Sequence, residues 1–214
     1  GEDRLVPGLC SAGGAACVSV QGANRLGGNS LLDLVVFGRA TGMHIQQELK
    51  SGGGVDSSTK SDINKSLERL NALNDSTSGY DPAEVKRELQ ECMQNYFGVF
   101  RRGEFMKKGL DQLSEIKEKV DNLHLKDKSN AFNTSRVEAI ELQNLFEVAE
   151  STAVSAFIRN ESRGAHARDD YPDRDDENWL CHTIFDPLTK EVSKRGVNFQ
   201  PSKVEAFPPK VRTY

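Results

Sequence analysis

Residues 21–33 read QGANRLGGNSLLD, and they join a glycine-rich segment to the first helix that the sequence predicts. Ser30 with Asp33 three residues later is a capping-box-like helix start, and the glycines at 52–54 are a stop signal. The helix opens with apolar residues on nearly every side, which is typical of a helix buried on all faces. We therefore predict a buried helix from Ser30 to the glycines, preceded by a short buried strand at residues 15–20.

The loop in front of this helix has the residue types of a binding site. Gly22 and Gly27 have the GxxxxG spacing of a P-loop, but Gly28 and Asn29 replace the lysine and the hydroxyl residue that this motif requires. The loop nevertheless brings backbone N–H groups and Arg25 to a helix N-terminus, where the helix dipole favours negative charge. The guanidinium fork of an arginine suits a carboxylate. We interpret the loop as an anion site; the alternative is that Arg25 pairs with a local acid and the glycines only permit tight packing.

Residues 61 to about 160 follow a helical pattern with short connections, which predicts an antiparallel bundle. Asp81 as N-cap, Pro82 in the first turn and Glu84 three residues after the cap form the clearest helix start. The stripes expected in the core are Ile63, Leu67, Leu70 and Leu73 in a first helix (61–74); Val85, Leu89, Cys92, Met93, Tyr96 and Phe100 in a second; Leu110, Leu113, Ile116 and Val120 in a third; and Val137, Ile140, Leu145, Val148 and Val154 in a fourth, from about Ser135. A strand is predicted at residues 179–185.

The composition argues against two classes of protein. The 28 basic and 32 acidic residues give a net charge of −4 without a basic stripe, so we expect no nucleic-acid partner. The longest apolar run, residues 31–37, contains Asp33 and is far shorter than the roughly 20 residues of a membrane-spanning helix. Partners would therefore have to hold the chain at a membrane. The cysteines have unrelated spacings, which predicts reduced, buried thiols and no metal site: Cys10, Cys17, Cys92 and Cys181.

A run of carboxylates follows the predicted bundle and invites a cation-site interpretation. Its members are Asp169, Asp170, Asp173, Asp175, Asp176 and Glu177. The run supplies neither the glycine at position six nor the glutamate at position twelve of a calcium loop, so we interpret it as a solvated or partner-facing turn. We expect His166 to pack near a domain junction, with catalysis as the alternative, and Arg163 to pair with a carboxylate across a domain interface rather than with substrate.

A family resemblance rests on ACVSV at 16–20, GANRLGGNSLLD at 22–33, VFGR at 36–39, ESRGAH at 161–166, RDDENW at 174–179 and FPPKVRTY at 207–214. The first three segments resemble the part of the chain that returns to the flavin domain in succinate dehydrogenase and fumarate reductase flavoproteins. The fourth is similar to a signature of the wider family, which includes L-aspartate oxidase. The last two resemble the succinate dehydrogenase branch, and the resemblance covers essentially the whole chain.

The resemblance implies roles for individual residues. Arg25 matches the arginine that binds a carboxylate of the dicarboxylate substrate. Ser30 and Leu31, with Asn29 beside them, match residues whose backbone faces the flavin ring of FAD. A helix N-terminus would stabilise the negative charge that the ring carries when reduced, which favours hydride acceptance. No catalytic residue is assigned within this chain.

The sequence also departs from the family pattern. Gly14 stands where the family has a glutamate that contacts FAD, and Gln21 stands where it has a histidine beside the substrate arginine. The dinucleotide fold, the histidine that bonds covalently to flavin and the capping domain with its proton-shuttling arginine have no counterpart in these 214 residues. We therefore expect the isolated chain to be inactive.

We predict a mainly α-helical chain in three parts: a fragment of an FAD-binding α/β domain (1–54), an antiparallel helical bundle (55–160) and a small α+β domain (161–214). With a partner chain that carries the N-terminal flavin domain, it would oxidise succinate to fumarate and pass electrons through an iron–sulfur subunit to quinone, with membrane anchor subunits bound indirectly. The expected location is the matrix side of the mitochondrial inner membrane, or the cytoplasmic face of a bacterial inner membrane. The alternative is a catalytically silent structural subunit derived from this flavoprotein and kept for assembly, as Gly14 and Gln21 would favour.

Overall fold

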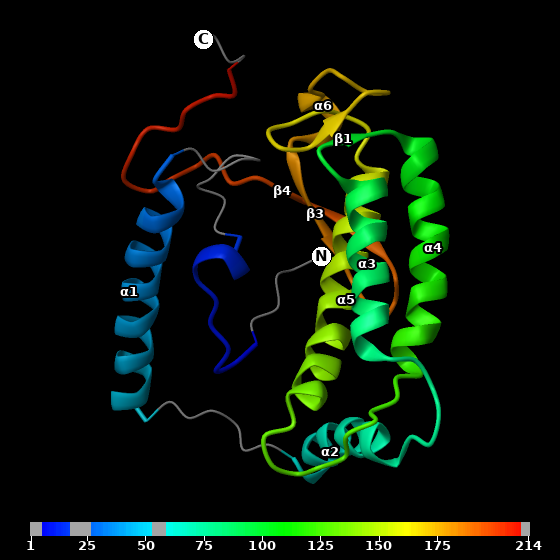
Figure 1. The fold of residues 1–214 in the computed structure, drawn as a ribbon. Coiled ribbons are helices and arrows are strands. Elements are labelled where there is room, and N and C mark those ends of the chain that lie inside the picture. The colour runs from blue at the N-terminus through cyan, green and yellow to red at the C-terminus, as the bar shows by residue number, and fades with distance from the viewer. Residues whose placement is uncertain (1–5, 18–26, 53–58, 211–214) are drawn as a thin grey trace. The chain divides into compact units, whose positions relative to one another are not determined.

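The computed structural model describes residues 6–17, 27–52 and 59–210. The chain divides into two compact units, residues 1–75 and 76–214, and each is described by itself. The first unit contains the short 3-10 helix η1 (Gly13–Ala15) and two α-helices, α1 (Asn29–Lys50) and α2 (Lys60–Asp75) (Figure 1). The three-part division expected from the sequence stays a prediction.

Helix α1 does not begin with the capping box that was predicted at Ser30 and Asp33. Gly28 is the N-cap, with a left-handed φ of 78° and no side chain to cap the helix, so Ser30 is already its second residue. Glycine adopts this conformation without steric cost. At the other end, Lys50 is the last residue and Gly52 has a φ of 80°, which confirms the glycine stop signal. The strand predicted at 15–20 is wrong for its first three residues, which contain the end of η1; residues 18–20 lie outside the described residues.

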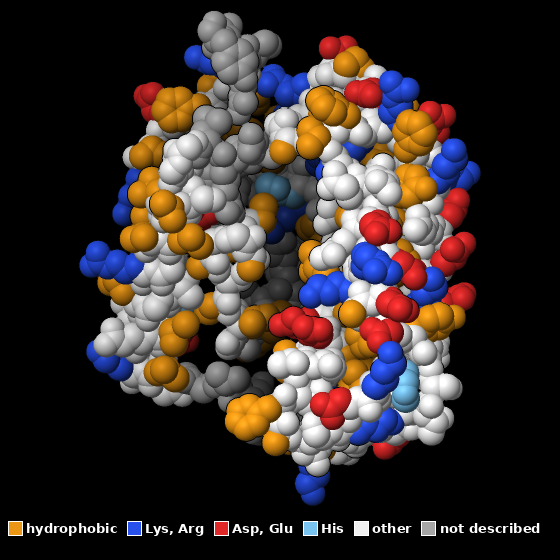
Figure 2. All heavy atoms as spheres, viewed as in Figure 1, with side chains coloured by type: hydrophobic (Ala, Val, Ile, Leu, Met, Phe, Trp, Pro, Cys, Tyr) orange, Lys and Arg blue, Asp and Glu red, His pale blue; other side chains and the backbone are white. Residues whose placement is uncertain are grey.

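The prediction that α1 is buried on all faces is wrong for this structure. Asp33 is its one buried residue, whereas most of its large apolar side chains are exposed: Leu31, Leu32, Leu34, Val35, Val36, Met43, Ile45 and Leu49. Figure 2 shows hydrophobic side chains exposed along this helix. Among the described residues of its own unit, the main element that packs on α1 is η1, a single turn of three residues. One turn cannot cover 22 helical residues, so the apolar surface stays open.

Helix α2 begins with a capping box that the sequence analysis missed. The hydroxyl of Thr59 donates to a carboxylate oxygen of Asp62 over 2.6 Å, and the same oxygen accepts from the Thr59 backbone N–H over 3.1 Å. In return, the Asp62 backbone N–H donates to the Thr59 hydroxyl over 3.2 Å. Of the four apolar residues predicted to form the core here, Leu73 is buried, whereas Ile63 and Leu67 are exposed.

The second unit contains three of the four helices of the predicted antiparallel bundle, and the first of the four, α2, belongs to the other unit. Its helices α3 (Pro82–Phe97), α4 (Gly103–Asp121) and α5 (Thr134–Ile158) lie side by side (Figure 1). Asp81 caps α3 by accepting a hydrogen bond from the Ala83 backbone N–H over 3.0 Å, which confirms the predicted helix start. Asn133 caps α5 in the same way, through the backbone N–H of Arg136.

Between the helices lies a core of well-buried side chains, chiefly Val85, Leu89, Cys92, Met106, Ile116, Leu125, Leu142 and Phe146. The predicted stripe was wrong on α5, because Val137, Leu145 and Val148 are exposed. The buried face of this helix is instead rich in alanine: Ala139, Ala149, Ala153 and Ala156. Small residues let neighbouring helices approach closely, but they carry a weak signal in a search for large apolar residues. Phe100 is exposed as well, and Phe97 takes its place in the core.

Two small sheets complete the second unit. Strand β1 (Phe100–Arg101) pairs in parallel with β2 (Ala167–Arg168). Strand β3 (Cys181–Phe185) pairs antiparallel with β4 (Val192–Gly196), so the strand predicted at 179–185 is confirmed from Cys181 onward. Trp179 ends the short helix α6 (Asp176–Trp179) instead. Across the described ranges, none of the helices is long and apolar enough to cross a bilayer.

We expect Gly109→Ala to destabilise the bundle. A Cβ at this position of α4 would lie 2.5 Å from a ring carbon of Phe97 and 2.6 Å from the Cβ of Tyr96 on α3. Overpacking costs about 1–3 kcal/mol, whereas alanine gains at most about 1 kcal/mol in helix propensity. Urea unfolding followed by circular dichroism should therefore give a lower midpoint than the wild type.

The matched control is Gly38→Ala in α1, where a Cβ would meet nothing within 4 Å. This variant should be neutral or gain slightly in helix content. If Gly109→Ala were as stable as Gly38→Ala, the close contact between α3 and α4 would be wrong.

Candidate functional site

The first candidate site is the N-terminal end of α1, where the sequence placed Asn29, Ser30 and Leu31. The backbone N–H groups of Leu31 and Leu32 donate to the Gly28 carbonyl over 3.1 and 3.2 Å. The first turn contains no acidic residue, and the N-cap has no side chain, so the positive end of the helix dipole is not neutralised by its own cap or first turn. Ser30 is half-buried, and Leu31 is 69% exposed.

This helix end fits one part of the FAD molecule. An exposed apolar surface beside the positive end of a helix suits a flat ring with a negatively charged edge. The dinucleotide part of FAD needs a βαβ unit and its phosphate-binding turn. The described residues of the first unit form helices and no strand, so they offer no such cradle.

Of the other residues predicted for the site, the structure describes Gly14 but neither Arg25 nor Gln21. Gly14 lies in η1, is exposed, and brings no side chain to the site. Its neighbour Gly13 packs against α1 so closely that an added Cβ would lie 2.1 Å from a methyl carbon of Leu34. Gly14 and the N-terminal end of α1 thus belong to the same unit. Arg25 and Gln21 lie outside the described residues.

A second group of polar residues lies where α5 ends, in the second unit, and it is built on the fully buried Glu161. The carboxylate of Glu161 accepts from Arg159 over 2.5 Å, from the Nε and Nη2 atoms of Arg163 over 2.8 and 2.9 Å, and from the backbone N–H of Asp175 over 2.9 Å. Burial alone would raise the pKa of Glu161, but these hydrogen bonds outweigh it and hold the pKa below its ordinary value. Glu161 is therefore a charged anchor.

Arg168 joins two helix ends in this group. Its Nη1 atom donates to the carbonyls of Ala156, Phe157 and Arg159, which α5 leaves without helical partners as it ends. Its Nε and Nη2 atoms bind both oxygens of Asp170 over 2.7 Å. One of these oxygens also accepts from the Gly103 backbone N–H, the first residue of α4, over 2.9 Å. The Arg168 guanidinium and this backbone bond lower the pKa of Asp170 far below its usual range.

The acidic run was predicted to be a solvated or partner-facing turn, and Asp169, Asp170, Asp173 and Glu177 are exposed, but four of its members also have partners within the chain. Asp169 pairs with Arg102 over 3.0 Å, Asp170 with Arg168, and Asp176 with Arg163 and Arg174. Asp175 caps α6 by accepting from the Asn178 backbone N–H. The alternation of arginines with these acids in residues 159–176 was the available signal. Within the described ranges, no three metal-ligating side chains come together.

Arg163 and His166 also have defined places in this group. Arg163 pairs with Glu161 and Asp176, both of the second unit. His166 lies between Arg101, which precedes α4, and the carbonyl of Arg159, which follows α5. Arg159 also stacks on Trp179, 5.1 Å from the ring centre, and donates to the Trp179 carbonyl over 2.9 Å. Charged side chains of residues 101–102 and 159–176 therefore fasten the last part of the chain to the bundle.

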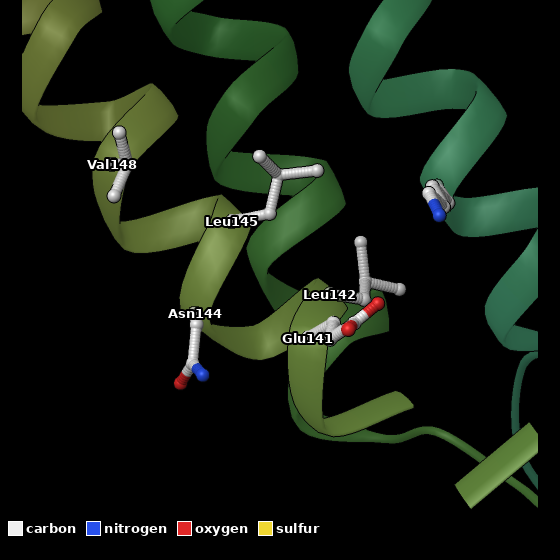
Figure 3. Close-up of a pocket in the computed structure, with 6 residues that line it drawn as sticks. Glu141, Leu142, Asn144, Leu145 and Val148 are labelled. Atoms are coloured by element: carbon white, nitrogen blue, oxygen red, sulfur yellow. The ribbon is translucent and has the colours of Figure 1, made fainter. Parts of the chain in front are cut away.

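A shallow depression of about 330 Å³ lies on the bundle between α3 and α5 (Figure 3). Lys86 of α3 lines it together with Glu141, Leu142, Asn144, Leu145 and Val148 of α5. This lining contains no histidine, cysteine or hydroxyl residue, and its one carboxylate and one ammonium group do not form a set for acid–base or nucleophilic chemistry. The surface around it mixes acidic and basic side chains (Figure 2).

Comparisons with known proteins agree with this fold. The FrdA chain of an E. coli quinol fumarate reductase variant superposes with a TM-score of 0.81 at 34% identity, over 95% of this chain and 35% of that one. The succinate dehydrogenase flavoprotein subunit of Coxiella burnetii is 47% identical over 212 residues, which are 99% of this chain and 36% of that protein. The mitochondrial succinate dehydrogenase [ubiquinone] flavoprotein subunit of Oryza sativa is 40% identical over 99% of this chain and 34% of that protein.

These matches define the class as flavoprotein subunits of the fumarate reductase and succinate dehydrogenase type. The family model for the fumarate reductase flavoprotein C-terminal region matches residues 86–214, and the chain belongs to this family. The chain spans about a third of the length of the curated relatives that it matches. The matched residues 86–214 include the bundle and the arginine–carboxylate group around Glu161.

Replacing Glu161 tests the role of this anchor. Glu161→Gln keeps the shape of the side chain but removes the carboxylate charge that pairs with Arg159 and Arg163, and leaves Arg163 with Asp176 alone. Removing one partner of a buried ion pair costs about 3–5 kcal/mol, and we expect the lower end because the two arginines are 13% and 17% exposed. Urea unfolding followed by the fluorescence of the one tryptophan, Trp179, measures the loss.

Glu147→Gln is the control, because Glu147 lies on α5 and is exposed. A change of less than about 0.5 kcal/mol is expected there. Equal unfolding midpoints for the two variants would contradict the role of Glu161 as an anchor.

Proposed function

We propose that this chain forms the C-terminal part of a succinate dehydrogenase flavoprotein. Joined to an N-terminal flavin domain on a partner chain, it would take part in oxidising succinate to fumarate, with electrons passing through an iron–sulfur subunit to quinone. The observation that carries this proposal is 47% identity to a succinate dehydrogenase flavoprotein subunit over nearly the whole chain. Bound FAD would supply the hydride acceptor.

The residues of this chain would do two things in that reaction. Arg25 would hold a carboxylate of the dicarboxylate substrate, since a guanidinium forms two parallel hydrogen bonds with a carboxylate and so fixes its orientation. Asn29, Ser30 and Leu31 would present the N-terminal end of α1 to the flavin ring. The uncapped glycine start and the absence of an acid in the first turn support this role, because both leave the helix end favourable for negative charge.

Residues 1–54 would then belong to the FAD-binding domain, residues 55–160 to the helical bundle and residues 161–214 to a small C-terminal domain. The exposed apolar side chains of α1 support this division, because a core helix of a larger domain has such side chains. We place the assembled enzyme on the matrix side of the mitochondrial inner membrane or on the cytoplasmic face of a bacterial one. Its anchor subunits would bind this chain only indirectly.

A catalytically silent subunit kept for assembly is the second candidate function. Gly14 favours it, because this exposed glycine offers no carboxylate at the position where the family has a glutamate that contacts FAD. The preserved glycine start of α1 and the retained Arg25 oppose it. The activity of the assembled complex with and without Arg25 separates the enzyme from the silent subunit.

The isolated chain should bind no FAD. Its described residues supply a helix end for the ring but no βαβ unit for the dinucleotide, and such a unit alone needs roughly 30 residues. The absorbance of the purified chain after incubation with FAD and gel filtration checks this. A yellow protein with nearly one flavin per chain would contradict it.

In an assembled complex with FAD, Arg25→Lys should reduce succinate-dependent dye reduction while leaving assembly intact. Lysine keeps the positive charge but loses the two-pronged geometry, so the substrate is held less well oriented. We expect a loss of about tenfold or more in kcat/KM, in line with about 1.5–3 kcal/mol for hydrogen bonds to a charged group. The matched control is Arg87→Lys, at an exposed position of α3.

Arg25→Ala then decides between enzyme and silent subunit. Activity that is present in the wild-type complex and lost in this variant supports the enzyme. Full activity that survives Arg25→Ala would place the chemistry in another chain of the complex and favour the silent subunit.

A further inference from the structure

His166 has both ring nitrogens engaged by groups that fix its protonation state. The Nδ1 atom lies 2.8 Å from Nη1 of Arg101, and the Nε2 atom lies 3.1 Å from the Arg159 carbonyl oxygen. A guanidinium group can only donate hydrogen bonds, and a carbonyl can only accept them. Nδ1 must therefore accept from Arg101 and Nε2 must donate to the carbonyl, so the ring is neutral with its proton on Nε2.

These two bonds connect different parts of the bundle. Arg101 also donates from Nε to the carbonyls of Phe97 and Gly98, over 3.2 and 3.0 Å, and so satisfies the end of α3. Arg159 is the C-cap of α5, directly after its last residue. The backbone of His166 exchanges two hydrogen bonds with Arg163, over 2.8 and 3.0 Å, which holds the ring at a tight turn next to β2. His166 therefore ties the turn to the ends of both helices.

We propose that His166 is a pH-sensitive joint, whose protonation on Nδ1 breaks the bond to Arg101 and loosens residues 161–175 from the end of the bundle. A protonated ring would direct an N–H group at an N–H group of Arg101 across 2.8 Å. Arginine cannot relieve this contact by giving up its own proton, because a guanidinium group stays charged throughout the pH range in which histidine titrates. Because Nε of Arg101 is held by the carbonyls of Phe97 and Gly98, we expect the turn to move rather than the guanidinium.

The surroundings of the ring strengthen the effect. The charged groups that act on it are the guanidinium groups of Arg101 from β1, Arg159 from the end of α5 and Arg168 from β2, all of them cations. Burial first, and these three charges with it, lower the pKa of His166 below 6.5, although the bond to the Arg159 carbonyl opposes them. In the folded chain the ring thus resists protonation more than in the unfolded chain.

The sign of the pH dependence follows from linkage. The stability contributed by neutral His166 is complete above pH 6.5 and is lost as the pH falls from there towards the folded pKa. At pH 5.5 the unfolding equilibrium constant should rise by up to about tenfold relative to pH 7.5, because only the unfolded chain takes up the proton readily. The anchoring carboxylates Glu161 and Asp170 have lowered pKa values and act at more acidic pH.

His182 is the competing group in the same pH range. Its pKa is lowered by burial and by the charges of Arg195 and Arg159. The pH dependence of the wild-type chain alone cannot separate the two histidines. The test therefore compares His166→Gln with His182→Gln, each of which removes one titrating ring and keeps a neutral polar side chain.

The experiment is urea unfolding of the full chain at pH 7.5 and 5.5, followed by Trp179 fluorescence. We expect the acid-induced rise in the unfolding constant to be mostly lost in His166→Gln and mostly kept in His182→Gln. His166→Asn, which offers an acceptor oxygen to Arg101, should behave like His166→Gln and replaces it if that variant does not fold. A rise that is the same in the wild type and in the foldable His166 variant would overturn the proposal.

Nitrogen-15 NMR of the histidine side chains provides an independent readout on the wild-type chain. At pH 7 the His166 signals should show a proton on Nε2 and none on Nδ1, and the ring should titrate below pH 6.5. A proton on Nδ1 at pH 7, or a titration above pH 6.5, would also overturn the proposal.

Discussion

The carbonyl end of a helix cannot be left in a protein interior without hydrogen-bond donors, and the second unit is arranged around that constraint. The helices α3 and α5 both end, and α4 begins, where residues 159–170 pass. Arg168 supplies donors to the last carbonyls of α5, Arg101 supplies them to α3, and Asp170 accepts from the first backbone N–H of α4. Arginines at helix C-termini and a carboxylate at an N-terminus also match the sign of each helix dipole. The bundle therefore depends on this polar end layer as well as on its apolar core.

The two units differ in how much of their apolar surface they bury and how many of their polar groups they pair. The second unit pairs most of the buried polar groups around Glu161 and Arg168 internally and buries its own core, so its described part has the features of a body that folds by itself. The first unit has a long apolar helix, a capping box and a tight glycine start, but little to pack against them. In a flavoprotein built in this way, the bundle would provide most of the stability. The residues that take part in the chemistry would lie on α1, and a larger domain would surround that helix.

Local signals predicted the helices well, because caps and breakers act within a few residues. Asp81 with Pro82 placed the start of α3, and Gly52 placed the end of α1. Burial was predicted less well, since periodicity shows which residues share a face but not what that face meets: Val148 is apolar and exposed, whereas Ala153 is small and buried. The pairing of Glu161 with Arg159 and Arg163 depends on where the chain turns, which the acidic run alone does not show. For the candidate site, the family motif predicts Asn29, Ser30 and Leu31, which stays a prediction, and the structure added the glycine that starts their helix.

The buried thiol of Cys92 can report when the bundle opens. Desolvation raises the pKa of this thiol to about 11, and its sulfur donates to the Gly109 carbonyl over 3.5 Å, so it is shielded from alkylating reagents while α3 and α4 stay together. Cys10 and Cys17, which were expected to be buried, are exposed and belong to the other unit. A thiol reagent would modify those two at once and the half-buried Cys181 according to its own exposure, and would reach Cys92 only when the helices separate. The delay before Cys92 is modified would time the opening of the bundle in a chain with no engineered label.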